Sequence, residues 1–562
     1  MVWVIEILEL LVVIGFLMAR QASRHLWVGL AGIALVLWPL LPNPPAWALA
    51  TAWILFTPVA LLLVITPLRE KLLIDPLLNL YEKVLPGMSD TERDALKAGT
   101  VWWAAELFSG QPDWHQLLGY PAASLTDEER AFLDGPVETL CGMINDWEIT
   151  EELRDLTPET WAYMKEQGFF GMIIPRQYGG LEFSANAHSL VVLKLASVSI
   201  SAGVTVMVPN SLGPAKLLLA YGTEAQKNHY LPRLADGTEI PCFALTGPEA
   251  GSDAAAMPDT GIICRQEFNG ESDVLGIRLS WEKRYITLGP VATLLGLAFH
   301  LYDPDHLTGV DDDVGITLAL IPTDTPGVEI GRRHFPMDQS FMNGPNRGRD
   351  VFIPMDWVIG GQAQLGNGWR MLMNCLSDGR AISLPALSVA AGRKMSRAVG
   401  AYAGVRKQFR IPIGRFEGVS EVLARIAAKA YIMNGARSLT CSALDNGEDP
   451  SVASAILKYH TTEYMRDVVN DGMDVLGGRG ICMGPNNFIA RGYQALPIGI
   501  TVEGANILTR NLIIFGQGAI RCHPFLFREM EAVSQHDVGG LDEALSGHVS
   551  LALGNITRSL FH

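Results

Sequence analysis

One glutamate in this chain of 562 residues stands where it could act as a base. Glu503 follows the apolar run Ile498–Val502 and precedes Gly504. Apolar surroundings disfavour the charged form of a carboxylate and raise its pKa towards neutrality, as a general base requires. The spacing therefore predicts proton abstraction by Glu503, while a solvated glutamate at the start of a loop is the simpler interpretation of the same pattern.

Two further segments join a strand-like run to groups that could bind a cofactor. In Cys242–Asp253 a strand leads into a turn of glycine and small hydroxyl residues, whose N–H and hydroxyl groups could hold a carbonyl edge or phosphate oxygens. In Trp281–Thr287 alternation places an aromatic and a hydroxyl side chain on one face of a strand. An ordinary surface turn and an edge strand with a half-buried tyrosine are the alternatives. The glycine cluster Gly477–Gly480 is a weak phosphate-binding signal, because no strand–helix context surrounds it.

The elements that position these segments follow the order helical, β, helical. Helix-like spacing in Leu190–Ala196 and Ala215–Ala220 predicts an N-terminal helical domain over 141–241. Short β-rich runs between turn residues predict an antiparallel β domain over 242–365, and long helical periodicity predicts a C-terminal four-helix bundle within 366–532. The fold class is therefore α+β with several domains. The expected strands are Ile277–Trp281, Arg284–Thr287, Val291–Tyr302, Gly315–Pro322 and Val351–Ile353, and the expected long helices are Ala390–Phe409, Ser420–Leu444 and Ser451–Leu476.

Apolar residues are concentrated before residue 70. Leu26–Leu68 contains no charged residue or histidine, which is enough for two spanning helices, and a Pro-Asn-Pro-Pro turn at 42–45 divides it. Leu10–Ala19 is a third apolar segment. Basic residues at 20, 24, 69 and 71 predict that both flanking loops and everything after residue 70 face the cytoplasm. We expect a membrane anchor over 1–70, with three spans or with two spans and an interfacial first helix. A hairpin in one leaflet is the main alternative, and the acidic start of the chain disfavours a signal peptide.

Charge and cysteine usage exclude several classes of function. The net charge is −16, from 43 basic and 59 acidic residues, which disfavours nucleic acid as a partner. Seven scattered cysteines without a C-x-x-C pair argue against a zinc site or a disulfide framework, so no metal is expected.

Two segments lie outside these domains. Residues 71–140 read as a connecting helical segment. Residues 533–562 begin a further amphipathic helical region that cannot bury its apolar face alone, as in a truncated chain.

Several motifs in one order resemble the acyl-CoA dehydrogenase family. They cover about residues 140–530 and are Gly171–Pro175, Tyr178–Gly180, Tyr221–Lys227, Tyr230–Pro232, Thr246–Asp253, Tyr285–Thr287, Arg406–Phe409 and Val502–Gly504. The stretch Thr501–Pro524 and the apolar N-terminus resemble the membrane-associated, bacterial FadE-type branch. This resemblance implies that the chain oxidises fatty acyl-CoA to trans-2-enoyl-CoA, the first step of fatty-acid β-oxidation, with FAD as cofactor.

The resemblance also assigns roles to single residues. Glu503 is the implied catalytic base, which removes the α-proton as the β-hydride passes to FAD. The implied substrate-binding residues are Ser252, Arg380 and Gly504. The implied flavin contacts are Phe243, Leu245, Thr246, Ser252, Tyr285 and Thr287 near the ring, and Arg406, Phe409, Gly477 and Gly478 near the pyrophosphate or adenosine of FAD on a neighbouring subunit. The last four imply a homo-oligomer.

Some positions depart from the family pattern. Gly247 stands where a glutamate is usual, and Ala505 and Ile507 replace a threonine and a glutamine that contact FAD. Asp474 replaces a glutamine near the adenosine. These changes affect dinucleotide binding and leave the base in place.

The implied partners are an electron-acceptor flavoprotein or a respiratory-chain component, at the cytoplasmic face of the inner membrane. An acyl-CoA oxidase using O₂ and a non-catalytic flavoprotein relative are the alternatives. A membrane scaffold without catalysis is a third, which the presence of Glu503 disfavours.

Overall fold

The computed structural model describes residues 12–40, 45–85, 87–211 and 213–561, and the chain divides into two compact units. The first unit contains the described residues of Met1–Arg93, Trp103–Leu117 and Gly516–His562. The second contains Asp94–Trp102 and the described residues of Leu118–Phe515. The first unit therefore includes the end of the segment that the sequence assigns to the C-terminal helical domain.

Several helices in the first part of the second unit start at side-chain caps. Thr126 and Thr223 each accept a hydrogen bond from the N–H three residues later, and the glutamate or glutamine at that position bonds back to the cap N–H. The amide of Gln226 also donates to the carbonyl oxygen of Val358 at 2.6 Å, which ties this helix to the sheet. The helices are α9 (Asp127–Asp134), α10 (Pro136–Met143), α11 (Pro158–Glu166), α12 (Ala185–Val198), α13 (Ile200–Ser211), α14 (Pro214–Tyr221) and α15 (Glu224–Ala235). Both helical segments expected here are confirmed, as α12 and α14.

Seven strands form one sheet in the order β1-β4-β2-β3-β7-β6, with β5 paired to β4. They are β1 (Pro241–Ala244), β2 (Thr260–Phe268), β3 (Glu271–Thr287), β4 (Leu294–Tyr302), β5 (Asp313–Pro322), β6 (Val328–Ile330) and β7 (Asn343–Pro354). The expectation of an antiparallel sheet is wrong for two pairs, since β1 and β2 both run parallel to β4. Neither pair is joined by a hairpin, so no turn residue fixes its direction. The β2–β3 hairpin, by contrast, turns at Asn269 and Gly270, whose φ angles are 52° and 85°.

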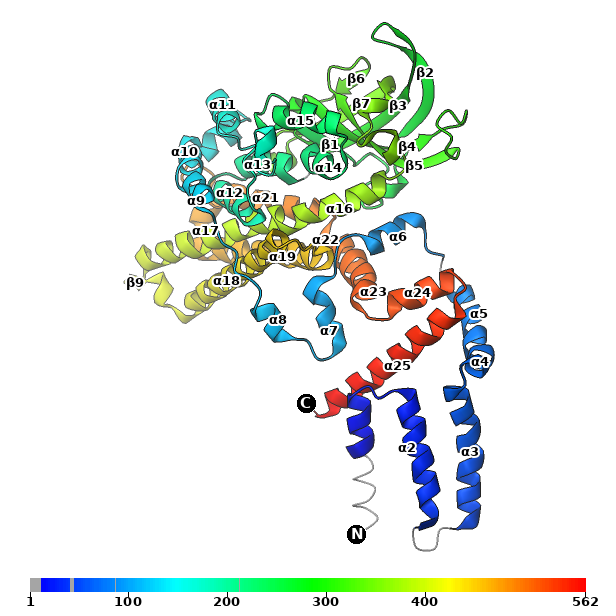
Figure 1. Cartoon of the computed structure of the whole chain (residues 1–562). Helices are drawn as coiled ribbons and strands as arrows, with labels where there is room; N and C mark the ends of the chain where they lie inside the picture. Colours follow the sequence, from blue (N-terminus) through cyan, green and yellow to red (C-terminus); the bar gives the residue numbers. More distant parts are fainter. Residues whose placement is uncertain (1–11, 41–44, 86, 212, 562) are drawn as a thin grey trace. The chain divides into compact units, whose positions relative to one another are not determined.

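The remainder of the second unit is helical, and its long helices α17, α18 and α19 lie side by side (Figure 1). Ion pairs Arg425–Asp471 and Lys429–Asp467, at 2.8 and 2.7 Å, join α18 to α19. The elements are α16 (Gly368–Ala381), α17 (Ser383–Val405), β8 (Lys407–Gln408), β9 (Ile411–Pro412), α18 (Glu417–Asp445), α19 (Ser451–Leu476), α20 (Gly478–Ile481), α21 (Ala490–Thr501) and α22 (Asn506–Leu508). The expected helix Ala390–Phe409 ends early, at Val405, because the left-handed Phe409 and the residue after it turn a short hairpin.

The first unit carries the apolar N-terminal helices. Helices α2 and α3 lie side by side (Figure 1) and bury none of their residues. After α3, Arg69 is buried against Asp542, with Nε and Nη2 donating to the two carboxylate oxygens at 2.7 and 2.5 Å. The helices are α2 (Arg24–Leu37), α3 (Ala46–Val64), α4 (Thr66–Arg69), α5 (Asp75–Val84), α7 (Glu106–Ser109), α23 (Ala519–Cys522), α24 (Leu526–Ser534) and α25 (Val538–Phe561). The expected turn at 42–45 lies, apart from Pro45, outside the described residues.

Candidate active site

Glu503 lies in a sharp turn between two helices. Helix α21 ends at Thr501 and α22 begins at Asn506; between them Glu503 and Gly504 have φ angles of 56° and 86°. A left-handed backbone costs a non-glycine residue about 1–3 kcal/mol and persists only where its surroundings hold it. The groups that hold this turn are therefore part of the site.

The carboxylate of Glu503 is shielded from solvent, and neither oxygen has a hydrogen-bond partner among the described residues. Gly379, near the end of α16, makes room for it: a Cβ there would lie 2.7 Å from Oε1 and 3.1 Å from Oε2. Burial raises the pKa of Glu503 to about 7, and the positive charges of Arg380 and Lys458 oppose that rise. The environment expected from the apolar run is therefore present.

Arg380 holds the backbone of the turn at Glu503. Its Nε donates to the Glu503 carbonyl oxygen at 3.0 Å. Burial lowers the pKa of Arg380, and the nearby Glu503 carboxylate partly compensates. The structure thus brings together Arg380, Glu503 and Gly504. The expected substrate-binding role of Arg380 stays a prediction.

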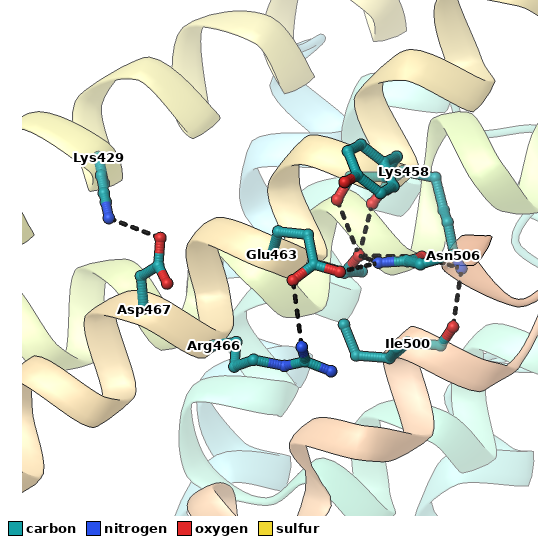
Figure 2. Close-up of polar contacts among 9 residues, drawn as sticks. Lys429, Lys458, Glu463, Arg466, Asp467, Ile500 and Asn506 are labelled. Atoms are coloured by element: carbon teal, nitrogen blue, oxygen red, sulfur yellow. Dashed lines mark hydrogen bonds and ion pairs between the residues drawn. The ribbon is translucent and has the colours of Figure 1, made fainter. Parts of the chain in front are cut away.

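A second cation at the turn, Lys458 of α19, was not expected from the sequence. Its Nζ donates to the carbonyl oxygen of Gly504 at 2.7 Å. It also donates to the carbonyl oxygen of Ile500 at 3.4 Å and to Asn506 Oδ1 at 2.6 Å (Figure 2). The sequence does contain a signal for this buried lysine, which is its helical spacing. Lys458 lies three residues after Ala455 and four before Thr462, so it shares a helix face whose other residues are uncharged and buried.

The loop after β1, expected to contact a flavin, is fastened to strand β3. The Arg284 N–H donates to the Thr246 carbonyl oxygen at 3.0 Å, and Lys283 Nζ donates to that of Leu245 at 2.9 Å. Lys283 is buried in an ion pair with Asp259 at 2.5 Å. A Cβ at Gly247 would lie 3.0 Å from the Glu282 carbonyl oxygen, which accounts for glycine at this position. Ser252 lies on the exposed part of the same loop.

Tyr285 and Thr287 lie at the end of β3, where a register shift between Lys283 and Ile286 interrupts the strand. Tyr285 has a φ of 62° and is 58% exposed, so strict alternation does not extend through this residue. The Asn343 amide holds the segment, because it donates to the Tyr285 carbonyl oxygen at 2.9 Å and to Thr287 Oγ1 at 3.3 Å.

Helix α16 lies near both the loop after β1 and Glu503. Phe243 and Leu245 pack against a buried cluster that includes Met371, Leu372 and Cys375 of α16. Gly379 lies four residues beyond Cys375, about 6 Å further along the helix. Helix α16 therefore contributes to the cluster against which Phe243 and Leu245 pack and, through Gly379, to the surroundings of the Glu503 carboxylate.

The remaining expected residues lie elsewhere in the second unit. Arg406 and Phe409 are in the exposed hairpin between α17 and α18, and Gly477 and Gly478 follow the end of α19. Because α18 and α19 are antiparallel, these residues share one end of the helices, whereas Lys458 lies towards the other end of α19. Within one chain the structure does not bring them to Glu503.

The chain matches four family models along its length. The acyl-CoA dehydrogenase N-terminal domain matches residues 125–238, the middle domain 242–343, the C-terminal domain 366–516 and the bacterial-type C-terminal domain 520–562. These matches follow the helical, β, helical order expected from the sequence.

Similar proteins agree with these matches. The probable acyl-CoA dehydrogenase FadE10 of Mycobacterium tuberculosis is 30% identical over 438 residues, which cover 77% of this chain and 63% of the relative. The human very long-chain specific acyl-CoA dehydrogenase is 26% identical, with 84% and 69% covered. The structure of butyryl-CoA dehydrogenase from Megasphaera elsdenii is 22% identical and covers 71% of this chain and 99% of that one, with a TM-score of 0.62, and it supports the fold. The chain spans a little under two thirds of the length of FadE10. It belongs to the acyl-CoA dehydrogenase family.

Proposed function

We propose that this protein is an FAD-dependent acyl-CoA dehydrogenase that oxidises fatty acyl-CoA to trans-2-enoyl-CoA in the first step of fatty-acid β-oxidation. The observation that carries the proposal is the buried carboxylate of Glu503 at a left-handed turn, whose oxygens accept no hydrogen bond from the described residues. Membership of the acyl-CoA dehydrogenase family, whose members are FAD-dependent oxidoreductases, supports it.

The residues expected around the flavin ring suit such a group. Thr246, Ser252 and Thr287 supply hydroxyls, and the exposed ring of Tyr285 offers an aromatic surface. Arg406 adds an exposed charge suited to a pyrophosphate. When bound, FAD supplies the acceptor for the hydride that leaves the substrate β-carbon.

Proton abstraction follows from the geometry at Glu503. With a pKa of about 7, its carboxylate is about half ionised at neutral pH, and no hydrogen bond within the described residues competes for its oxygens. The Glu503 N–H likewise has no acceptor within the described part of the chain. This N–H is free to donate to the thioester carbonyl, which gains negative charge as the α-proton leaves.

The test is anaerobic mixing of the purified flavoprotein with acyl-CoAs of several chain lengths. We expect the flavin absorbance to bleach and trans-2-enoyl-CoA to form, and Glu503→Gln to abolish both while FAD stays bound. Absence of bleaching at every chain length, or normal bleaching in Glu503→Gln, contradicts the proposal. Rapid reoxidation of the reduced flavin by O₂ would identify an oxidase instead.

A membrane anchor is the second part of the proposal. Within the described residues one helix, α3, is long and apolar enough to cross a membrane, and none of its 19 residues is buried. Helix α21 and the helical segment after it pass the same test only as a pair bent by 45°, and Leu496 of α21 packs in the protein core. The basic residues that flank α2 and α3 favour a catalytic part on the cytoplasmic side of the inner membrane. Retention in the membrane fraction after alkaline carbonate washing, with protease access only from the cytoplasmic side, is the expected result.

The far end of the long helices supports a homo-oligomer. Phe409 is 89% exposed, and Val405 and Ile481, at the same end of the helices, are also exposed. Apolar side chains exposed in this way mark contact surfaces. Light scattering is expected to show an oligomer that Phe409→Asp weakens, with loss of FAD. The proposed electron acceptor is a flavoprotein or a respiratory-chain component, and reduction of each by the acyl-CoA-reduced enzyme distinguishes them.

A further inference from the structure

Lys458 lies across the break between helices α21 and α22. Its Nζ contacts the carbonyl oxygen of Ile500, in the last turn of α21, and that of Gly504, after the left-handed Glu503. Carbonyl groups at a helix C-terminus lack intrahelical donors, and a cation there also meets the negative end of the helix dipole. One buried ammonium group therefore satisfies acceptors on both sides of Glu503.

Asn506 completes this attachment from the other side. Its Oδ1 accepts from Lys458, and its Nδ2 donates to Thr462 Oγ1 at 3.0 Å and to Glu463 Oε1 at 2.7 Å (Figure 2). The Glu463 carboxylate also pairs with Arg466 at 3.3 Å. The Asn506 amide is thus bound to residues of α19, and Lys458 and Asn506 together attach the turn to that helix.

The charges at this place are few. Glu503 is faced by Arg380 of α16 and Lys458 of α19, and Lys458 is faced by Glu503, Arg380 and Glu463. Burial lowers the pKa of Lys458 to about 8, so it is mostly protonated at neutral pH. Its charge and its hydrogen bonds therefore act together on Glu503.

We propose that Lys458 is the positioning residue for the catalytic Glu503: from α19 it holds the Ile500 and Gly504 carbonyl groups, so fixing the turn that aims the carboxylate, and it places a buried positive charge beside that carboxylate. This inference rests on the proposed function. Lys458 acts through Glu503 and touches no reacting atom.

The test compares Lys458→Met with Lys429→Met in the full-length flavoprotein. Lys429 of α18 is the matched control, because it forms an ion pair with Asp467 of α19 at the protein surface, nine residues along α19 from Lys458 (Figure 2). Anaerobic flavin reduction is measured from pH 6 to 9 with the acyl-CoA that the wild type reduces fastest. Binding of trans-2-enoyl-CoA is followed through the flavin spectrum. Hydrogen exchange of the peptide covering 499–508 reports on the turn without requiring activity.

We expect Lys458→Met to slow reduction at pH 7 by about tenfold or more, because the base is misplaced. The pH of half-maximal rate should rise by about one unit, because a compensating charge is lost. Exchange at 499–508 should speed up, enoyl-CoA affinity should stay within about threefold, and Lys429→Met should match the wild type.

Wild-type rate and pH profile in Lys458→Met would overturn the inference. A loss that is equal at every pH and accompanied by weaker enoyl-CoA binding would also overturn it, since it indicates general damage. If Lys458→Met does not fold, Asn506→Ala is used instead, because it removes one partner of Lys458 and keeps the positive charge of Lys458. We then expect slower flavin reduction with an unshifted pH profile. An unchanged rate of flavin reduction contradicts the inference. If the wild type reduces no acyl-CoA while exchange still speeds up in Lys458→Met, the proposed function fails and the attachment of the turn stands.

Discussion

Gly379→Ala separates catalysis from stability, because the new methyl group meets the carboxylate of the base. The added Cβ would lie 2.7 Å from Glu503 Oε1, whereas ordinary contact begins at 3.4 Å, so the carboxylate must move by about 0.7 Å. A misplacement of about 1 Å can cost on the order of 10²-fold in rate. We therefore expect flavin reduction to slow by about 10- to 100-fold.

The same substitution should leave the fold intact. Gly379 lies in helix α16, where alanine is favoured over glycine by about 0.5–1 kcal/mol, and the clash involves the end of a flexible side chain. Gly400→Ala in α17 is the control, since a Cβ there meets no atom within 4 Å. Stopped-flow bleaching gives the rate, and thermal unfolding gives the stability. A Gly379→Ala enzyme with wild-type rate, or with the same rate loss as Gly400→Ala, would refute the packing of Gly379 against the base.

Four further predictions concern buried charges. The rate of flavin reduction should rise with pH through about pH 7, as Glu503 ionises. The fold raises the pKa of Glu503 from 4.5 to about 7, so the stability due to this group is present at pH 4 and lost as the pH rises through 7. Glu503→Gln should therefore raise the free energy of unfolding at pH 8 by up to about 3 kcal/mol and leave it unchanged at pH 4. Denaturant titrations at the two pH values measure this. Lys283→Met leaves the buried Asp259 carboxylate without its ion-pair partner and should lower the free energy of unfolding by about 3–5 kcal/mol. It should also cause loss of bound FAD. Denaturant unfolding and the flavin content of the purified protein measure the two effects. Arg69→Met should destabilise the first unit by less than the loss expected for Lys283→Met, since the buried Asp542 keeps its ion pair with Arg24 at 3.5 Å; limited proteolysis that finds no new cleavage there contradicts this.

Local sequence pattern predicted many of the elements but not how the strands pair. Periodicity located α12, α14, α18 and α19, because the apolar face of a helix is written in its own residues. The parallel pairing of β1 and β2 with β4 depends on segments distant in sequence, which alternation does not record. The early end of α17 depends on two left-handed residues, neither of them glycine, in the hairpin after it. Strand β2 was not expected, although the hairpin residues Asn269 and Gly270 follow it directly.

The candidate site shows the same division. Glu503 and Arg380 were singled out from their motifs, and the structure brings them together, with Arg380 Nε 3.0 Å from the Glu503 carbonyl oxygen. Lys458 was missed, since a lone lysine in a long helix looks like a solvated residue until its neighbours are known. Asn506 lies in the stretch Thr501–Pro524, which was interpreted only as a family resemblance, and its role in joining the turn to α19 follows from contacts across more than forty residues of sequence.

The most direct test of Glu503 as the base is single-turnover flavin reduction by acyl-CoA, compared between the wild type and Glu503→Gln at pH 8. We expect complete bleaching in the wild type, slowed when the substrate α-carbon carries deuterium, and no bleaching in Glu503→Gln although it binds FAD and trans-2-enoyl-CoA. Two results would contradict the role of Glu503 as the base. One is bleaching of Glu503→Gln at the wild-type rate. The other is a wild-type rate that deuterium at the substrate α-carbon does not slow, under conditions where proton removal limits the rate.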